Sequence, residues 1–130
     1  MPDMPLNAGK HVAVSSEREL YREICACIEE GIISGAFPEE SQIPSTNRLA
    51  RLYMINPATA LKGVNLLVDQ GVLYKRRGIG MFVSTGARDM LLEQRRGRFA
   101  SEYVRPLVNE AVRLGITRER LIEMIDEEEL

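Results

Sequence analysis

The residues best suited to chemistry form a cationic turn, Lys75-Arg76-Arg77-Gly78-Ile79-Gly80. Short apolar runs at 72–74 and 81–83 flank it, which predicts two strands joined by a basic hairpin turn. Arginine fits a narrow minor groove electrostatically, and glycine lets the backbone approach closely. We therefore expect the hairpin tip, Arg76, Arg77 and Gly78, to contact a nucleic acid. For Lys75 and Arg76, an ordinary solvated charge beside a strand is an equally good interpretation.

A second group of polar residues opens a helix just before this hairpin. Asn56 is an N-cap residue type, Pro57 suits a first helical turn, and Gly71 suits the end, so a helix is expected over 57–70. Its expected apolar face comprises Ala60, Leu61, Val64, Leu67 and Val68, with Leu61 in the core. The exposed start should reach phosphates and base edges through Asn56, Pro57, Ala58, Thr59 and Lys62. For Asn56, the alternative is a helix cap alone.

A shorter helix is expected just upstream of these residues. Ser45 can cap it, and Leu49, Ala50 and Leu52 give it an apolar stripe. Its opening residues, expected to face the same ligand, are Ser45, Thr46, Asn47 and Arg48. Helix, turn, helix and basic hairpin in this order predict a winged helix-turn-helix. The second helix would enter a major groove while the hairpin reaches the adjacent backbone or minor groove.

Residues 20–83 resemble the N-terminal domain of GntR-type bacterial transcription regulators. The resemblance includes Ile33-Ser34-Gly35 at the end of a helix, Ile43-Pro44-Ser45 before the first reading helix, and the pattern R-x-G-x-G-x-x-V over 76–83. Asn-Pro-x-Thr at 56–59 is typical of the YtrA-like subfamily, which has a short two-helix tail. The resemblance implies a DNA-binding transcriptional regulator, with repression as the expected direction.

The resemblance also bears on single positions. An arginine that contacts DNA in the family falls on Asn47 here, so either the adjacent Arg48 substitutes for it from a different angle or the contact is lost. The fatty-acid-type relatives carry arginines at the positions of Pro57 and Leu61. The DNA sequence preference of those relatives therefore cannot be transferred to this chain. The family's minor-groove contact falls on Arg77 and Gly78. The family usually places glycine where Glu40 or Ser41 stands, so this turn is expected to be built differently.

Charge is distributed unevenly along this chain of 130 residues, whose net charge is −2. Residues 42–86 hold six cations and one acid, a sum of +5, whereas residues 87–130 hold eight arginines and ten acids, a sum of −2. Concentrated positive charge is what phosphate contact requires, because each neutralised phosphate releases condensed counterions. The length allows one small domain with an extension, and we expect an arm over 1–15, a DNA-binding domain over 16–85 and a helical region over 86–130.

A helix is also expected before the helix-turn-helix. It begins at Ser16, with Glu19 in a capping-box position, and ends at Ser34. Two cysteines, Cys25 and Cys27, lie on this helix and diverge too far around it to pair easily. Cys25 is expected to be a small buried hydrophobe, with redox sensing as the alternative. The single histidine, His11, lies in the arm near a possible strand over 11–14 and has no metal-ligand partners around it in the sequence.

The C-terminal region predicts a helical hairpin. One helix begins at Ala87 and should kink or divide at Pro106, and a second follows a Thr117 cap beyond Gly115. A hairpin of this length cannot bury two apolar faces alone, so we expect it to form a homodimer. The residues expected in the dimer contact are Phe99, Tyr103, Leu107, Val108, Ala111, Leu114, Leu121, Ile122 and Ile125.

Taken together, the patterns favour a homodimeric regulator that reads a pseudo-palindromic operator in double-stranded DNA. The alternative is a protein-interaction winged helix without DNA binding. An enzyme is disfavoured because the sequence holds no nucleophile–histidine–acid set, no metal-ligand spacing and no phosphate-binding loop. We expect no cofactor or metal, although an unidentified small-molecule effector stays open. No apolar run is long enough to span a membrane, and no secretion signal is evident, so a cytoplasmic protein is expected.

Overall fold

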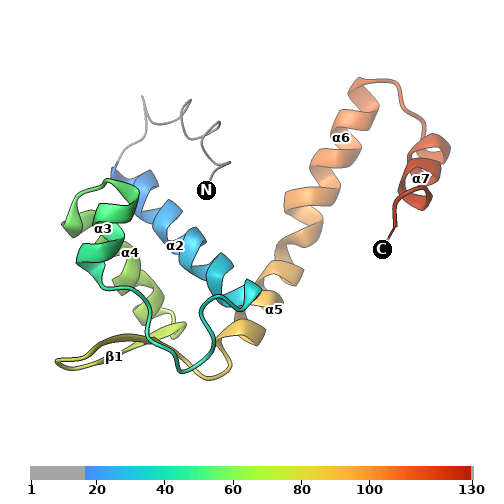
Figure 1. The fold of residues 1–130 in the computed structure, drawn as a ribbon. Coiled ribbons are helices and arrows are strands. Elements are labelled where there is room, and N and C mark those ends of the chain that lie inside the picture. The colour runs from blue at the N-terminus through green and yellow to red at the C-terminus, as the bar shows by residue number, and fades with distance from the viewer. Residues whose placement is uncertain (1–16, 130) are drawn as a thin grey trace. The chain divides into compact units, whose positions relative to one another are not determined.

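The computed structural model of this chain describes residues 17–129, and its residues form two compact units that divide between Leu91 and Leu92. We call the described part of the first unit the head (17–91) and that of the second the tail (92–129). The head contains α2 (Glu17–Ser34), α3 (Thr46–Tyr53), α4 (Pro57–Asp69), β1 (Leu73–Arg76), β2 (Gly80–Val83) and the first turn of α5 (Ala87–Phe99) (Figure 1). The predicted arm over 1–15, which includes His11, and the predicted Ser16 cap lie outside the described residues.

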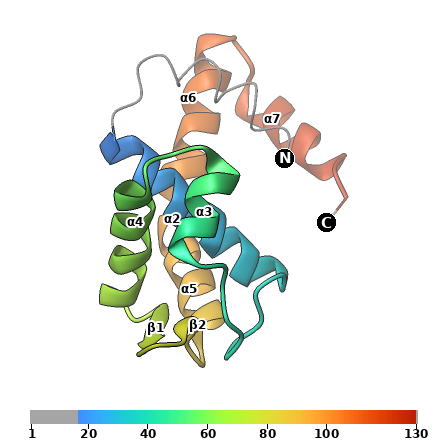
Figure 2. The same ribbon diagram turned by 60° about the vertical axis from the view of Figure 1, so that its left-hand side comes forward.

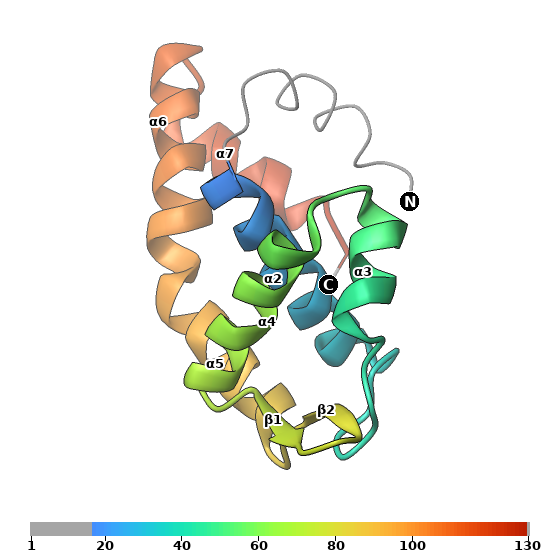
Figure 3. The same cartoon turned by 90° about the vertical axis from the view of Figure 1, so that its left-hand side faces the viewer.

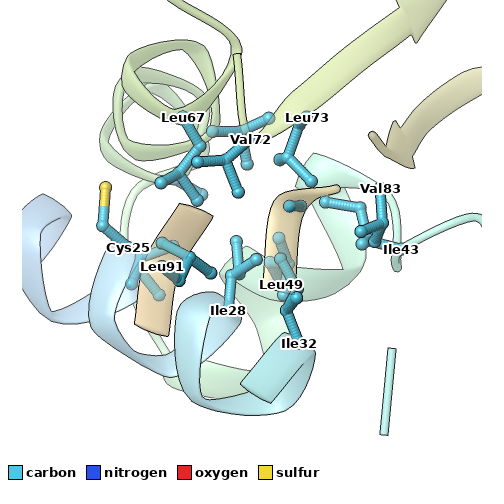
Figure 4. Packing of buried hydrophobic residues seen from close by; sticks show 14 of the residues in the cluster. Cys25, Ile28, Ile32, Ile43, Leu49, Leu67, Val72, Leu73, Val83 and Leu91 are labelled. Atoms are coloured by element: carbon cyan, nitrogen blue, oxygen red, sulfur yellow. The ribbon is translucent and has the colours of Figure 1, made fainter. Parts of the chain in front are cut away.

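The core of the head is built on α2. Ile24, Ile28 and Ile32 recur every four residues and are almost completely buried, as an amphipathic helix requires. Helix α4 packs against both α2 and α3 (Figure 2). Figure 4 shows Leu91, from α5, packed near Cys25 and Ile28. The first turn of α5 therefore belongs to the core of the head.

The wing consists of β1 and β2, which pair antiparallel with Leu73 opposite Val83 and Arg76 opposite Gly80. The segment before α3 adds a short third edge, because the Ile43 amide donates to the Met81 carbonyl at 3.0 Å and the Val83 amide donates to the Ser41 carbonyl at 3.0 Å. In Figure 3 this segment runs beside β2. The wing is thus attached on one side to the turn that leads into α3.

The fold prediction is confirmed: the described chain is mainly helical with a small two-stranded wing, and Gly71 ends the α4 region with a φ of +83°. The prediction that Leu61 packs in the core is wrong, because its side chain is 43% exposed. Leu52, expected on the apolar stripe of α3, is 60% exposed, whereas Leu49 and Ala50 of that stripe are buried. In α4 the buried side is set by Ala60, Val64 and Leu67, and a residue next to Ala60 is turned about 100° away from it.

The tail comprises the rest of α5, a π-helical turn η1 (Ala100–Val104), α6 (Arg105–Arg113) and α7 (Arg118–Asp126). Pro106 does divide the regular α-helix, and the π turn lies just before it. In this turn the Arg105 amide donates to the Ala100 carbonyl, five residues back. The Thr117 hydroxyl caps α7 by accepting from the Arg120 amide at 3.1 Å. Within residues 17–129, none of the helices combines the length and apolar character needed to cross a membrane.

Candidate nucleic-acid interface

Two helix starts on the head carry most of the predicted contact residues. The Ser45 hydroxyl accepts from the Arg48 amide at 3.1 Å, which starts α3. The Asn56 side-chain oxygen accepts from the Ala58 amide at 2.7 Å, which starts α4. These caps leave an exposed polar surface at both helix starts, where amide groups and the helix dipole favour an anion. The exposed members of the predicted set here are Ser45, Asn47, Arg48, Asn56, Pro57, Ala58 and Lys62, and Thr46 is half-buried.

Thr59 occupies a different position from its neighbours in the predicted set. Its relative exposure is 4%, and it lies on the side of α4 that also buries Ala60 and Gly63. In this state the threonine faces the core more than the solvent. The contact with DNA expected of Thr59 stays a prediction. Such a contact could use only the small exposed part of a side chain that is almost fully buried.

Lys62 has an aromatic neighbour that the sequence did not indicate. Its ammonium nitrogen lies 4.6 Å from the centroid of the Tyr21 ring on α2, and the Arg22 guanidinium lies 5.6 Å from the same ring. A cation over an aromatic face is attracted by the ring's quadrupole. Tyr21 therefore restricts the long Lys62 side chain at the exposed surface of α4, beside a second cation.

The wing tip is a tight turn that presents Arg77 and Gly78. The Ile79 amide donates to the Arg76 carbonyl at 2.9 Å, and Gly78 has a φ of +77°, which suits glycine. The guanidinium of Arg76 lies 5.0 Å from the centroid of the Phe82 ring. Arg76, Arg77 and Gly78 are all exposed. The three wing residues expected from the sequence therefore lie together at one exposed turn.

Gln42 holds this turn from the neighbouring segment. Its side-chain nitrogen donates to the Ile79 carbonyl at 2.8 Å. A Cβ atom at Gly80 would lie 2.5 Å from that nitrogen, and Gly80 has a φ of +145°. The backbone conformation thus favours glycine at this position, and a side chain there would also displace the end of the Gln42 side chain from its bond to Ile79. Sequence reasoning missed Gln42, because a glutamine before a turn carries no signal for a partner far along the chain.

A cleft of about 340 Å³ lies between the start of α3 and the wing, with Leu61 of α4 in its lining. Its lining joins two groups that were predicted separately, the start of α3 and the wing. The lining residues are Gln42, Ile43, Ser45, Thr46, Leu61, Lys75, Arg76, Gly78, Ile79, Gly80 and Met81. Leu61 and Ile79, which the sequence did not mark as contact residues, are both more than 40% exposed. The cleft therefore offers cations, amides and apolar side chains to one ligand.

The electrostatics of this surface favour a polyanion. All six cations of the +5 segment are exposed. In the tail, by contrast, several arginines are paired with acids, as Arg96 is with Glu93 at 3.0 Å and Arg113 with Glu110 at 3.5 Å. Among residues 17–129, no group of three histidine, cysteine or acidic side chains is arranged to hold a metal ion. The chemistry on offer at this surface is hydrogen bonding and charge neutralisation of phosphates, with apolar contact to bases.

In sequence and in fold, this chain is similar to bacterial regulatory proteins. Residues 20–83 match the family model described as bacterial regulatory proteins, gntR family. The HTH-type transcriptional repressor YtrA of Bacillus subtilis is 28% identical over 112 residues, which is 86% of this chain and 85% of the relative. A solved structure described as a transcriptional regulator of the GntR family, from Bacteroides thetaiotaomicron, is 34% identical with a TM-score of 0.63, covering 83% of this chain and 94% of that chain.

The fold is also similar to that of BusR from S. agalactiae, which was solved in complex with its busA promoter DNA. The TM-score is 0.53 and the identity is 20%, over 82% of this chain and 55% of that chain. At this level of identity the likeness concerns the fold alone.

Proposed function

Because the chain belongs to the GntR family of bacterial regulatory proteins, we propose that it is a homodimeric transcriptional repressor that reads a pseudo-palindromic operator. The similarity to YtrA of Bacillus subtilis confirms the YtrA-like resemblance. In the proposed complex α4 enters the major groove and the tip of the wing enters the adjacent minor groove. Its place would be the cytoplasm, where a bacterial regulator meets chromosomal DNA.

One observation supports DNA binding above the others, namely the cleft between the start of α3 and the wing. It brings Ser45 and Thr46, from one element, to the same opening as Arg76 and Gly78, from another. A phosphate strand that passes between the start of α3 and the wing meets hydrogen-bond donors on both sides, the hydroxyls of Ser45 and Thr46 and the guanidinium of Arg76. The binding of promoter DNA by BusR, a protein of similar fold, agrees with this use of the fold.

The proposal of a homodimer is supported by the tail. Phe99 is 57% exposed, Tyr103 64% and Leu114 62%. Also exposed are Leu107, Val108, Ile122 and Ile125, whereas Leu121 is half-buried and Ala111 is buried. Apolar surface of this extent on a short helical unit marks a protein contact. A second copy of the tail would cover it symmetrically and would place two heads on the two halves of one operator.

Selection of binding sites from a random duplex library, using the purified full chain, tests the proposal. The expected result is enrichment of an inverted repeat whose half-sites lie about one helical turn, roughly 34 Å, apart. Enrichment of a single half-site would contradict the dimeric part of the proposal. Recovery of no sequence above background at low salt would overturn DNA reading, and would favour the protein-interaction alternative.

A further inference from the structure

Glu40 has a backbone conformation that its residue type disfavours. Its φ is +68°, in the left-handed region where a side chain with a Cβ is strained. Glycine would take this conformation without cost. A strained residue persists where its surroundings hold it, and such residues are concentrated at functional positions. The contacts of the Glu40 side chain therefore indicate what keeps a glutamate in this turn.

The Glu40 carboxylate joins parts of the head that are far apart in the sequence. It accepts hydrogen bonds from the Tyr74 hydroxyl, on β1, and from the Thr85 hydroxyl, in the connection to α5. The Glu40 amide also donates to the Val83 carbonyl, at the end of β2, at 2.8 Å. These side-chain bonds, Thr85 first and Tyr74 second, hold the pKa of the Glu40 carboxyl below its usual value. One residue thus ties both strands of the wing to one turn.

The contacts continue from Tyr74 to the basic end of the wing. The Tyr74 ring stacks on the Phe82 ring with 5.8 Å between centroids. The Arg76 guanidinium lies over the same Phe82 ring, 5.0 Å from its centroid. Because Phe82 is 8% exposed, this stack is a fixed part of the wing. The hydrogen bond from Tyr74 to Glu40 therefore holds a ring that packs, through Phe82, against Arg76.

The neighbouring residue extends the same turn to α5. The Glu39 carboxylate accepts from the Arg88 amide at 3.3 Å, and the Arg88 guanidinium donates to the Ile33 carbonyl at 2.9 Å. The turn at 39–40 is thus bonded to the wing, to the connection at Thr85 and to the first turn of α5. These bonds all lie within the head.

We propose that Glu40 is a positioning residue for DNA binding, whose carboxylate fixes the wing on the head so that Arg76 and Arg77 meet the DNA in one geometry. This inference rests on the proposed function. Glu40 itself would repel phosphate, so its role is exerted through Tyr74 and the wing. If Glu40 had no positioning role, its replacement by glycine would be expected to improve stability and DNA binding. Glycine relieves the backbone strain at this position, and loss of a negative charge favours association with a polyanion.

The test compares Glu40→Gly with the wild type, with Glu23→Gln as the control that removes an exposed carboxylate elsewhere on the head. Binding to the selected operator is measured by fluorescence anisotropy well below the unfolding temperature of each variant. Glu40→Gly should weaken binding about tenfold, a loss of the size expected for charge-assisted hydrogen bonds. Glu40→Gln, which keeps an acceptor oxygen, should recover part of that affinity. Unchanged or tighter binding by Glu40→Gly would overturn the proposal.

Tyr74→Phe tests the hydrogen bond between the Tyr74 hydroxyl and the Glu40 carboxylate without changing the backbone of the turn. This variant keeps the ring stack and deletes the hydroxyl, so it should weaken binding alone and have no further effect in the Glu40→Gly background. Additive losses in the double variant would contradict a shared role for Glu40 and Tyr74.

Hydrogen exchange of the free protein provides a second readout that needs no DNA. In Glu40→Gly the amides of residues 76–80 should exchange faster than in the wild type, while those of α4 keep their protection. Unchanged exchange at 76–80 overturns the proposal, whatever the affinity. If the wild type binds no duplex, the proposed function fails and this exchange measurement alone decides whether Glu40 fixes the wing.

Discussion

Leu61 shows how a single side chain can change the expected chemistry of a reading surface. It is 43% exposed and lines the cleft opposite the wing, on the exposed side of α4 that also carries Ala58 and Lys62. A leucine there offers no hydrogen bond to a base edge. In the major groove, the apolar group available to it is the C5 methyl of thymine.

We predict that Leu61→Ala lowers operator affinity by about fivefold, the scale of one lost apolar base contact of about 1 kcal/mol. Deoxyuridine in place of one particular thymine should weaken the wild type similarly and leave Leu61→Ala unaffected. Anisotropy with single-substituted operators checks this. Leu52→Ala, which truncates another exposed leucine of the head, is the matched control. Equal sensitivity of wild type and Leu61→Ala to every deoxyuridine would contradict the contact.

Cys25 is a second residue whose environment determines its chemistry. It is buried, and its thiol donates to the Gly63 carbonyl at 3.1 Å. Burial, with a smaller contribution from the charge of Glu29, raises the pKa of the Cys25 thiol from 9.0 to about 11. Since the thiolate is the reactive form, the folded head should protect this thiol.

We predict that Cys25 is alkylated far more slowly in the native protein at pH 8 than in denaturant, as measured by mass spectrometry of the peptides. The sign for stability follows from the raised pKa. The contribution of this thiol is fully present below pH 9 and is lost as the pH rises from 9 toward 11. Equal alkylation rates in the native and denatured protein would contradict the burial of the thiol and reopen a redox role.

At the scale of the residue, the sequence was informative where the cause is local. The caps at Ser45 and Asn56 and the glycine after α4 follow from rules that act within a few positions. The exposure of Leu61 could not be predicted, because the apolar face of α4 is broad and its centre depends on where α2 and α3 pack. The cation–π contact of Lys62 with Tyr21 could not be predicted either, because it depends on how two helices pack against each other.

Among the elements, the contact between α2 and α4 depends on one glycine. A Cβ at Gly63 would lie 2.8 Å from the Tyr21 carbonyl oxygen and 3.4 Å from the Ile24 side chain. The first distance is too short for a real contact, and the obstacle is backbone, which cannot turn aside. Gly97, in α5, offers a contrast because nothing lies within 4 Å of a Cβ built there.

We predict that Gly63→Ala destabilises the protein by about 1–3 kcal/mol, the cost of overpacking a core. Gly97→Ala should instead stabilise it by up to about 1 kcal/mol, because alanine favours a helix over glycine. Denaturant titration followed by circular dichroism measures both. A Gly63→Ala variant as stable as the wild type would show that the two helices can separate without cost.

The bounds of a helix or strand could be predicted from the sequence where residues at its ends carry a local signal. The helix ends and the hairpin follow from capping residues, glycines and the basic turn. The third edge of the wing does not, because residues 41–43 carry no strand pattern and are held by bonds to Met81 and Val83 on β2. The π turn before Pro106 was also not specified, since a proline indicates an interruption without fixing its form.

For the whole molecule, association through the tail is the expected consequence of the exposed apolar residues there. We predict that Leu107→Asp, which places a charge among them, raises the dissociation constant of the dimer at least about tenfold. Sedimentation velocity over a concentration series should then show a monomer where the wild type is a dimer. Arg113→Ala, which breaks only an exposed ion pair, should leave the dimer unchanged. A wild type that stays monomeric at all concentrations would contradict this.

In the proposed complex the head binds DNA with the wing on the phosphates or in the minor groove. Anisotropy titrations of wild type, Arg77→Ala and Arg113→Ala on the selected operator, over a salt series, test whether the wing makes this contact. The wild type should lose affinity steeply with salt, and the slope should be shallower by about one unit in Arg77→Ala alone. Weak binding with a flat salt dependence in all three proteins, or identical slopes in wild type and Arg77→Ala, would contradict it.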